Sequence, residues 1–270
     1  MITTVVEKIG APPRIAVEYA GTGEPVLFMH GIGGNRRNWH DQIPAFANYF
    51  KTIAWDARGY GDSDDYEGSL DFQSYADDAV RVLDHFALAK INLVGLSMGG
   101  RIAMDFAARH ADRLKTLVLC DTHKGFSGLS PEARAAFVTS RKEPLMNGKE
   151  PKDIAGPVAK TLIGPNASQA AYEALVDSMS RLHKESYIKS IEASVNMDVR
   201  TDLGNIEVPT LVVVGSADRL TTVDMAKSIA ADIAGAELSI IEGAGHLVNI
   251  EEPEQFNSIV VDFLRRKLNG

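Results

Sequence analysis

The sequence has a single cysteine and no long hydrophobic run. Cys120 cannot form a disulfide within the chain, and its place at the end of the apolar run Thr116 to Leu119 predicts a small buried side chain. No apolar stretch approaches the ~20 residues that a transmembrane helix needs. The first residues also lack the basic start, apolar centre and cleavage site of a signal peptide. We therefore expect a cytoplasmic protein with no membrane partner.

Motifs for binding metals and nucleotide phosphates are also missing. The chain has no His/Cys/Asp cluster with zinc-ligand spacing, no His-Glu-x-x-His pattern and no Gly-x-x-x-x-Gly-Lys-Ser phosphate loop. Its net charge of −8 disfavours nucleic acid and anionic membranes as partners. These absences predict chemistry without a cofactor, on a small-molecule partner.

The chain does have an ordinary globular composition and a regular alternation of strand-like and helix-like segments. Its 270 residues are 45% hydrophobic and 24% charged, which suits one large α/β domain or two small ones. Runs such as Leu211 to Val214 are apolar on successive residues, which is typical of strands buried on both faces of a parallel sheet. We predict an α/β fold with a doubly wound, mostly parallel sheet, helices on both faces, and strands at 14–19, 25–29, 51–55, 91–94, 116–120, 210–214 and 237–241.

The strand pattern stops between the two halves of this predicted sheet. Helical periodicity instead covers 131–141, 153–162, 168–179 and 185–196, with expected breaks at Gly156-Pro157 and Gly164-Pro165. We interpret residues 123–204 as a helical cap over the carboxyl edge of the sheet, where ligands bind in open α/β sheets. Residues 1–122 and 205–270 would then form the core. The alternative is an unrelated helical domain.

The most informative segment is Gly95-Leu96-Ser97-Met98-Gly99. It follows the apolar run Ile91 to Val94 and precedes an amphipathic stretch, so the serine lies where a strand turns abruptly into a helix. Glycines two positions to either side relieve the crowding of such a turn and leave the hydroxyl projecting at the strand tip. We predict that Ser97 is a catalytic nucleophile; the alternative is that it only caps the helix.

A serine nucleophile needs a base, and the base needs an acid to orient it. His246 lies in the glycine-rich loop Gly243 to Val248 directly after a predicted strand, and we expect it to be the base. Asp218, in a small-residue loop after another predicted strand, is the expected acid. Asp121, at the tip of the strand that ends at Cys120, is the competing candidate.

The developing oxyanion of such a reaction needs preorganised hydrogen-bond donors. The loop His30-Gly31-Ile32-Gly33-Gly34 follows a predicted strand, and its glycines allow backbone amides to approach a ligand closely. We predict that the amides of Ile32 and Met98 form the oxyanion hole, the latter assisted by the helix that begins there. His30 is expected to brace this loop through hydrogen bonds.

With these motifs, the chain resembles the α/β-hydrolase superfamily over essentially its whole length. Within it, the sequence is similar to the group of 3-oxoadipate enol-lactonases, carboxylesterases and meta-cleavage C–C hydrolases, which share the Ser-Met-Gly-Gly elbow at 97–100. The Asp-x-Arg-Gly-x-Gly-x-Ser stretch at 56–63 is frequent in the superfamily, and we expect Asp56 and Arg58 to be ion-pair partners there. Haloalkane dehalogenases and epoxide hydrolases have aspartate at the elbow, so Ser97 disfavours their chemistry.

The resemblance implies a serine hydrolase that cleaves carboxylic ester or lactone bonds through an acyl-enzyme. The alternatives are C–C bond hydrolysis of meta-cleavage-type diketone acids and a ligand-sensing receptor that retains the triad. Candidate substrate-binding residues are Gly31, where the lactonases often have Ser, and Trp39, Arg141 and Met146. Arg141 has the geometry to grip a carboxylate, although a solvated surface position is the simpler interpretation. Whether the chain forms a homo-oligomer is left open.

Overall fold

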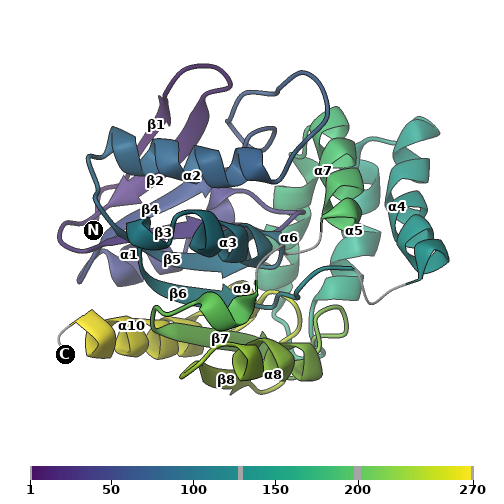
Figure 1. Ribbon diagram of the computed structural model, residues 1–270. Helices are drawn as coiled ribbons and strands as arrows, with labels where there is room; N and C mark the ends of the chain where they lie inside the picture. Colours follow the sequence, from purple (N-terminus) through teal and green to yellow (C-terminus); the bar gives the residue numbers. More distant parts are fainter. Residues whose placement is uncertain (1, 127–129, 198–201, 269–270) are drawn as a thin grey trace.

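The computed structural model describes residues 2–126, 130–197 and 202–268. Its centre is a sheet in the order β1-β2-β4-β3-β5-β6-β7-β8 (Figure 1). The two pairings that involve β2 are antiparallel, and the neighbours from β4 through β8 pair in parallel. The strands are β1 (Val5–Ile9), β2 (Ile15–Ala20), β3 (Pro25–Met29), β4 (Lys51–Asp56), β5 (Ile91–Leu96), β6 (Leu114–Cys120), β7 (Thr210–Gly215) and β8 (Glu237–Ile241).

The predicted doubly wound α/β fold is confirmed, and each predicted strand is present. The sequence analysis missed β1, which pairs only with β2 at one edge of the sheet. Most of its side chains are exposed, so it lacks the continuous apolar run that marks the central strands.

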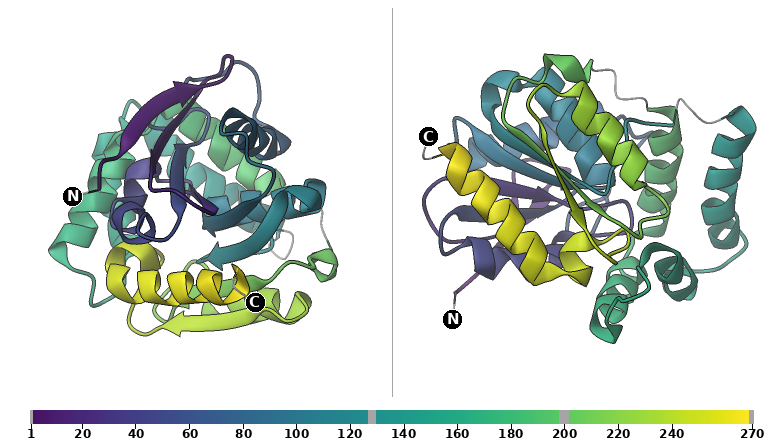
Figure 2. Two further views of the ribbon diagram at one scale, coloured as in Figure 1. Left: turned by 90° about the vertical axis from the view of Figure 1, so that its left-hand side faces the viewer. Right: turned by 90° about the horizontal axis from the view of Figure 1, so that it is seen from below.

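Helices cover both faces of the sheet (Figure 2). Helices α2 (Gln73–His85), α3 (Met98–Arg109) and α8 (Val223–Asp232) lie on one face. Helices α1 (Gln42–Phe46) and α10 (Pro253–Leu268) lie on the other. The short helical turns η1 (Arg36–Trp39), η2 (Ala111–Arg113), η3 (Leu203–Asn205) and α9 (Val248–Glu251) complete the connections.

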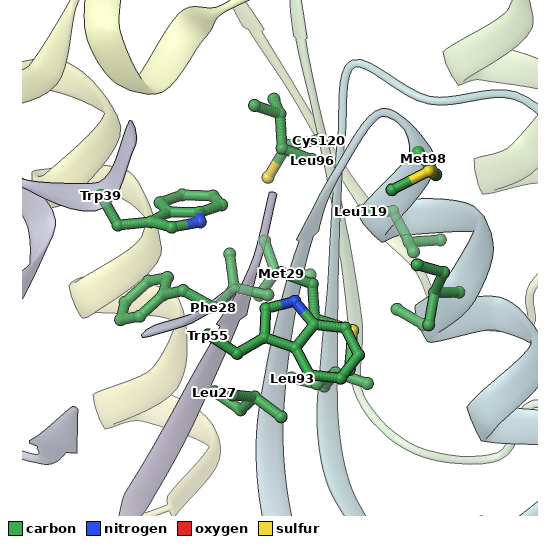
Figure 3. Close-up of a cluster of buried hydrophobic side chains, with 14 of the residues drawn as sticks. Leu27, Phe28, Met29, Trp39, Trp55, Leu93, Leu96, Met98, Leu119 and Cys120 are labelled. Carbon is green, nitrogen blue, oxygen red and sulfur yellow. The ribbon is translucent and has the colours of Figure 1, made fainter. Parts of the chain in front are cut away.

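The core lies between these helices and the central strands. Figure 3 shows Phe28 and Trp39 packed on one side of the strands and Leu119 on the other. All three are fully buried. Cys120 is buried among the same side chains, as predicted, and burial raises the pKa of its thiol well above the usual value. It therefore behaves as a small apolar residue.

Between β6 and β7, the described residues form four α-helices that stand beyond one end of the sheet (Figure 1). They are α4 (Pro131–Met146), α5 (Pro151–Leu162), α6 (Gln169–Ser180) and α7 (Lys184–Asn196). The predicted helices are confirmed, but the expected break at Gly156-Pro157 is wrong, because Pro157 lies inside α5. A proline removes only one intrahelical hydrogen bond, which the rest of this helix tolerates. In the part of the chain that the structure describes, no helix combines the length and apolar character of a membrane span.

The stretch after β4 forms ion pairs, but not the pair predicted from the sequence. The fully buried Asp56 pairs with Arg36 of η1, whereas Arg58 pairs with the fully buried Asp78 of α2, its Nε 2.6 Å from Oδ2. These two bridges fasten the loop after β4 to η1 and to α2. Asp56 and Arg58 are therefore both in ion pairs but do not pair with each other.

Candidate active site

Ser97 sits in the turn between β5 and α3 with a strained backbone, at φ +54° and ψ −114°. Such a conformation is costly for a non-glycine residue and is held only where the surroundings enforce it. The neighbouring glycines make the turn possible: a Cβ on Gly95 would lie 2.4 Å from the carbonyl oxygen of Gly99, and one on Gly99 would lie 2.2 Å from that of Met29. The Ser97 amide donates to the Cys120 carbonyl at 2.8 Å, which ties the turn to β6.

His246 lies in the loop that follows β8, at the same edge of the sheet as Ser97. Its Nε2 is 2.9 Å from Ser97 Oγ, so the serine hydroxyl can donate to it. The backbone amide of His246 donates to the Leu162 carbonyl at 2.8 Å, which fastens this loop to the end of α5. The ring is almost fully buried, at 4% exposure for the residue.

Asp218, in the loop after β7, completes a hydrogen-bonded chain. Its Oδ2 is 2.8 Å from Nδ1 of His246, and its Oδ1 accepts from the amides of Leu220 at 2.7 Å and Thr221 at 2.9 Å. The Thr221 hydroxyl donates to Oδ2 at 2.5 Å. Asp218 accepts a hydrogen bond from Nδ1–H, which keeps the proton of the neutral imidazole on that nitrogen. The ring therefore presents an unprotonated Nε2 to the serine, as a general base requires.

The charges of this pair stabilise each other. Burial alone would lower the pKa of His246, but the hydrogen bond to Asp218 and its negative charge outweigh that effect and raise the pKa above the usual value. Burial would likewise raise the pKa of Asp218, and its hydrogen bonds with His246 and Thr221 lower it overall. The arrangement favours an imidazolium beside a carboxylate, the charge state that forms when His246 takes a proton.

Asp121, the competing acid, occupies a different position. Its Oδ1 accepts from the Gly215 amide at 2.9 Å and its Oδ2 from the Val248 amide at 3.1 Å. It thus joins the loops that carry Asp218 and His246 without a hydrogen bond to the imidazole. Burial raises its pKa to about 8.

The predicted oxyanion donors also lie at this edge. Among the described residues, neither the Ile32 amide nor the Met98 amide donates a hydrogen bond to another group of the protein. Met98 is the first residue of α3, so its N–H has no partner within the helix. A Cβ on Gly31 would lie 3.2 Å from Cβ of Ser97, which shows how closely this loop approaches the serine.

His30 braces the same loop, as the sequence analysis predicted. Its Nδ1 donates to the Gly31 carbonyl at 2.8 Å, and its Nε2 accepts from the Ala57 amide at 3.0 Å. The ring is fully buried, and burial lowers its pKa. A neutral imidazole with one donor and one acceptor satisfies both contacts.

A narrow, mostly apolar cavity leads to Ser97, with about 50 Å³ of room for the centre of a water molecule. Helices α4 to α7 supply much of its wall through Phe137, Val158, Leu162, Leu175 and Met179. Gly31 and Arg141, two of the candidate substrate-binding residues, line this cavity. Within the described ranges, no group of three or more His, Cys, Asp or Glu side chains is placed to hold a metal ion.

Two predicted pocket residues are wrong. Trp39 is fully buried in the core, with its ring centroid 4.9 Å from that of Phe28, because η1 turns the side chain toward the sheet. Met146 is 63% exposed at the end of α4, one helical turn beyond Arg141 and facing solvent. A residue that is close to a site residue in the sequence can therefore point away from the site, when its helix directs the side chain elsewhere.

Three polar residues of this site were not predicted. Thr221 orients Asp218, as described above. Glu251 of α9 accepts from the amides of Gly245 and Leu247, which flank His246, and from that of Gly164. Tyr187 of α7 lines the cavity. Of the three, only Thr221 closely follows a loop aspartate, whose carboxylate commonly accepts hydrogen bonds from the backbone just after it.

Comparison with known proteins agrees with this fold. A sequence model of the alpha/beta hydrolase fold matches residues 24–253. The chain belongs to the α/β-hydrolase family. The resemblance inferred from its motifs is thereby confirmed.

Individual relatives extend over nearly the whole chain. It is similar to 3-oxoadipate enol-lactonase 2 of Acinetobacter baylyi, at 28% identity over 93% of this chain and 94% of that protein. It is also similar to a 2-hydroxy-6-oxononadienedioate/2-hydroxy-6-oxononatrienedioate hydrolase of Escherichia coli, at 31% identity over 97% and 94%. Among solved structures, a thermophilic esterase from Thermogutta terrifontis superposes with a TM-score of 0.87 at 29% identity, over 99% of both chains.

Proposed function

We propose that this α/β-hydrolase cleaves a carboxylic ester or lactone bond of a small molecule through an acyl-enzyme. Family membership and its relatives make the chain a hydrolase. The finer proposal rests chiefly on one observation, the hydrogen-bonded chain from Ser97 through His246 to Asp218 at the inner end of an apolar cavity.

In the first half of the reaction, His246 Nε2 accepts the Ser97 hydroxyl proton as Oγ attacks the substrate carbonyl carbon. The carbonyl oxygen becomes an oxyanion that accepts hydrogen bonds from the Ile32 and Met98 amides. Each such donor contributes about 3 kcal/mol to the stability of the transition state. Asp218 stabilises the imidazolium that forms.

In the second half, His246 donates its proton to the leaving alkoxide, and the tetrahedral intermediate collapses to an acyl-enzyme. His246 then accepts a proton from water, whose oxygen attacks the acyl carbon. Collapse of this second intermediate releases the carboxylic acid and returns the proton to Ser97. A lactone gives a single hydroxy-acid product, because its alkoxide and acyl group belong to one molecule.

We further propose that helices α4 to α7 act as the cap over this site. Side chains such as Phe137, Val158 and Met179 enclose the cavity above Ser97 with apolar surface. An enclosed apolar site excludes bulk water and strengthens the electrostatic interactions at the reacting atoms. The cap therefore carries most of the contacts that would select a substrate.

The test is hydrolysis of p-nitrophenyl butyrate together with covalent labelling by a fluorophosphonate. Ser97→Ala should lower kcat by about 10⁶-fold and abolish labelling. Ser180→Ala, a serine on α6 whose hydroxyl bonds within its own helix, should leave both unchanged. Retained turnover or labelling in folded Ser97→Ala protein would refute the serine mechanism. Stoichiometric labelling with very slow turnover on all esters and lactones would instead favour the receptor alternative.

C–C bond hydrolysis is the second candidate, favoured by the 31% identity with the E. coli relative. The same three residues would act after the substrate ketonises. A vinylogous 1,5-diketone acid, followed by loss of its visible absorbance, distinguishes the two candidates. A much higher kcat/KM for that compound than for esters and lactones would replace the ester proposal.

A further inference from the structure

Arg141 is an unpaired cation in the wall of the apolar cavity. Its guanidinium stacks on the Phe137 ring, with Cζ 3.7 Å from the ring centroid, and Nη1 makes two long contacts of 3.3 Å to the Phe137 carbonyl and the Ser140 hydroxyl. Among the described residues, Nε and Nη2 donate to nothing, and no carboxylate lies within ion-pair distance. Burial lowers the pKa of this guanidinium, the sign of a cation without a compensating anion.

Tyr187 presents a second unsatisfied donor in the same cavity. The residue is only 1% exposed, yet its hydroxyl forms no hydrogen bond with any residue in the described part of the chain. Buried tyrosine hydroxyls usually have a partner, because leaving one unpaired costs free energy. Arg141 lies close enough for its charge to lower the pKa of Tyr187, against the larger effect of burial that raises it.

The other residues that line the cavity offer no anion to these two donors. Apart from Arg141, Tyr187 and His246, the described lining is apolar or uncharged. The next residue on α4, Lys142, has its own partner outside, with Nζ 2.5 Å from Glu192 Oε1. An isolated cation in an apolar wall is costly unless a ligand neutralises it.

We propose that Arg141 and Tyr187 form a subsite for a carboxylate on the substrate, so that the preferred ester or lactone carries an acid group remote from the scissile bond. This proposal rests on the proposed ester or lactone hydrolysis at Ser97. The planar guanidinium offers two parallel N–H donors that match a carboxylate, and the tyrosine hydroxyl adds a third. One positive charge balances a monoanion, which favours a carboxylate over a phosphate monoester.

The first arm of the test compares matched p-nitrophenyl esters. The charged series consists of monoesters of adipic to suberic acid, and the neutral series consists of hexanoate to octanoate esters of the same chain lengths. The wild-type protein should prefer the charged ester of at least one length by about tenfold or more in kcat/KM, mainly through KM, since a hydrogen bond to a charged group contributes a factor of roughly ten to a hundred.

Variants then assign that preference to the subsite. Arg141→Gln should remove this preference, lowering kcat/KM for each charged ester at least tenfold more than kcat/KM for the neutral ester of the same chain length. Tyr187→Phe should lower the preference for charged esters severalfold, and Arg141→Lys should retain part of that preference. Lys142→Gln is the control, because it removes a positive charge from the next residue, which is already paired with Glu192. This variant should leave the preference for charged esters unchanged. Equal loss for charged and neutral esters in Arg141→Gln, or no preference in the wild type, overturns the subsite.

A second arm does not depend on turnover. Titration calorimetry with Ser97→Ala protein compares monomethyl suberate with the corresponding methyl ester amide, in which the only carboxylate is replaced by a neutral carboxamide. The monomethyl suberate should bind at least tenfold more tightly than the amide, and Arg141→Gln in the Ser97→Ala background should abolish that difference. If the wild type hydrolyses no ester but this difference is found, the proposed function fails and the subsite stands. If esters are hydrolysed and the difference is absent, the subsite fails and the proposed function stands.

Discussion

Glu251→Gln should impair both stability and activity, although Glu251 touches neither Ser97 nor His246 through its side chain. Its Oε2 accepts from the amides of Gly164 at 2.7 Å and Gly245 at 2.9 Å, and its Oε1 accepts from that of Leu247 at 3.1 Å. These bonds join the start of the loop after α5 to both neighbours of His246. One nearly buried carboxylate therefore sets the position of the imidazole.

The expected cost follows from those three bonds. A glutamine keeps one acceptor oxygen, which can retain the Gly164 and Gly245 amides, but its NH₂ group then faces the Leu247 N–H. Leaving that buried amide unpaired costs about 1–3 kcal/mol. Replacing the other two charge-assisted bonds by neutral ones adds about 1 kcal/mol each, for a total of roughly 3–5 kcal/mol. A displacement of His246 by ~1 Å would lower kcat by about a hundredfold.

Urea denaturation and p-nitrophenyl butyrate kinetics measure the two effects. Glu252→Gln is the matched control, because it removes the same charge from the adjacent residue, whose side chain forms no hydrogen bond with the described part of the protein. Glu252→Gln should change stability by less than about 0.5 kcal/mol. If the two variants have the same free energy of unfolding and the same kcat, Glu251 does not hold the loop and the reasoning is wrong.

Further predictions concern the acid, the base and a buried ion pair. Asp218→Asn should lower kcat by roughly 10⁴-fold, whereas Asp121→Asn should cost far less; the reverse order in steady-state kinetics would make Asp121 the triad acid. Because His246 must be neutral to accept a proton and its pKa is raised above 6.5, kcat/KM should increase with pH through a midpoint above 6.5. NMR titration of Asp218→Asn should place the imidazole midpoint lower than in the wild type, and an unchanged midpoint would exclude Asp218 as its partner. Arg36→Met should lower the free energy of unfolding in urea by about 3–5 kcal/mol, since it leaves Asp56 buried and unpaired, and a change below about 1 kcal/mol would contradict that.

The central elements of the site were predictable because their signals are local. The glycines around Ser97 are required by close backbone contacts at its turn, and the strands before Ser97 and Asp218 are buried along their whole length. In a parallel sheet, the loops at the carboxyl ends of neighbouring strands meet at one edge. Local turn chemistry and sheet topology were therefore sufficient to bring three distant residues together.

Features that depend on how helices rotate and pack were not predictable in this way. Trp39 follows the loop of Ile32 closely in sequence, but η1 directs its ring into the core. Asp56 and Arg58 lie two residues apart and pair instead with Arg36 and Asp78, which packing brings near. The sequence alone does not identify either ion-pair partner, because several other charged residues along the chain would be equally suitable.

For Arg141 the sequence favours a solvated surface position, whereas the structure places the residue in the wall of the cavity. On α4 it stands next to Lys142, and composition alone assigns both to a solvated face. In the fold, Lys142 reaches Glu192 on the outside, whereas Arg141 turns inward over Phe137 toward Tyr187. The two residues differ in their partners rather than in their charge. Lys142 already has a carboxylate, whereas the half-buried Arg141 has none among the described residues and can offer its donors to a ligand. The same criterion explains why Arg36, although close to the loop of Ile32, is a poor candidate for binding substrate, since Asp56 and Asp62 already neutralise it.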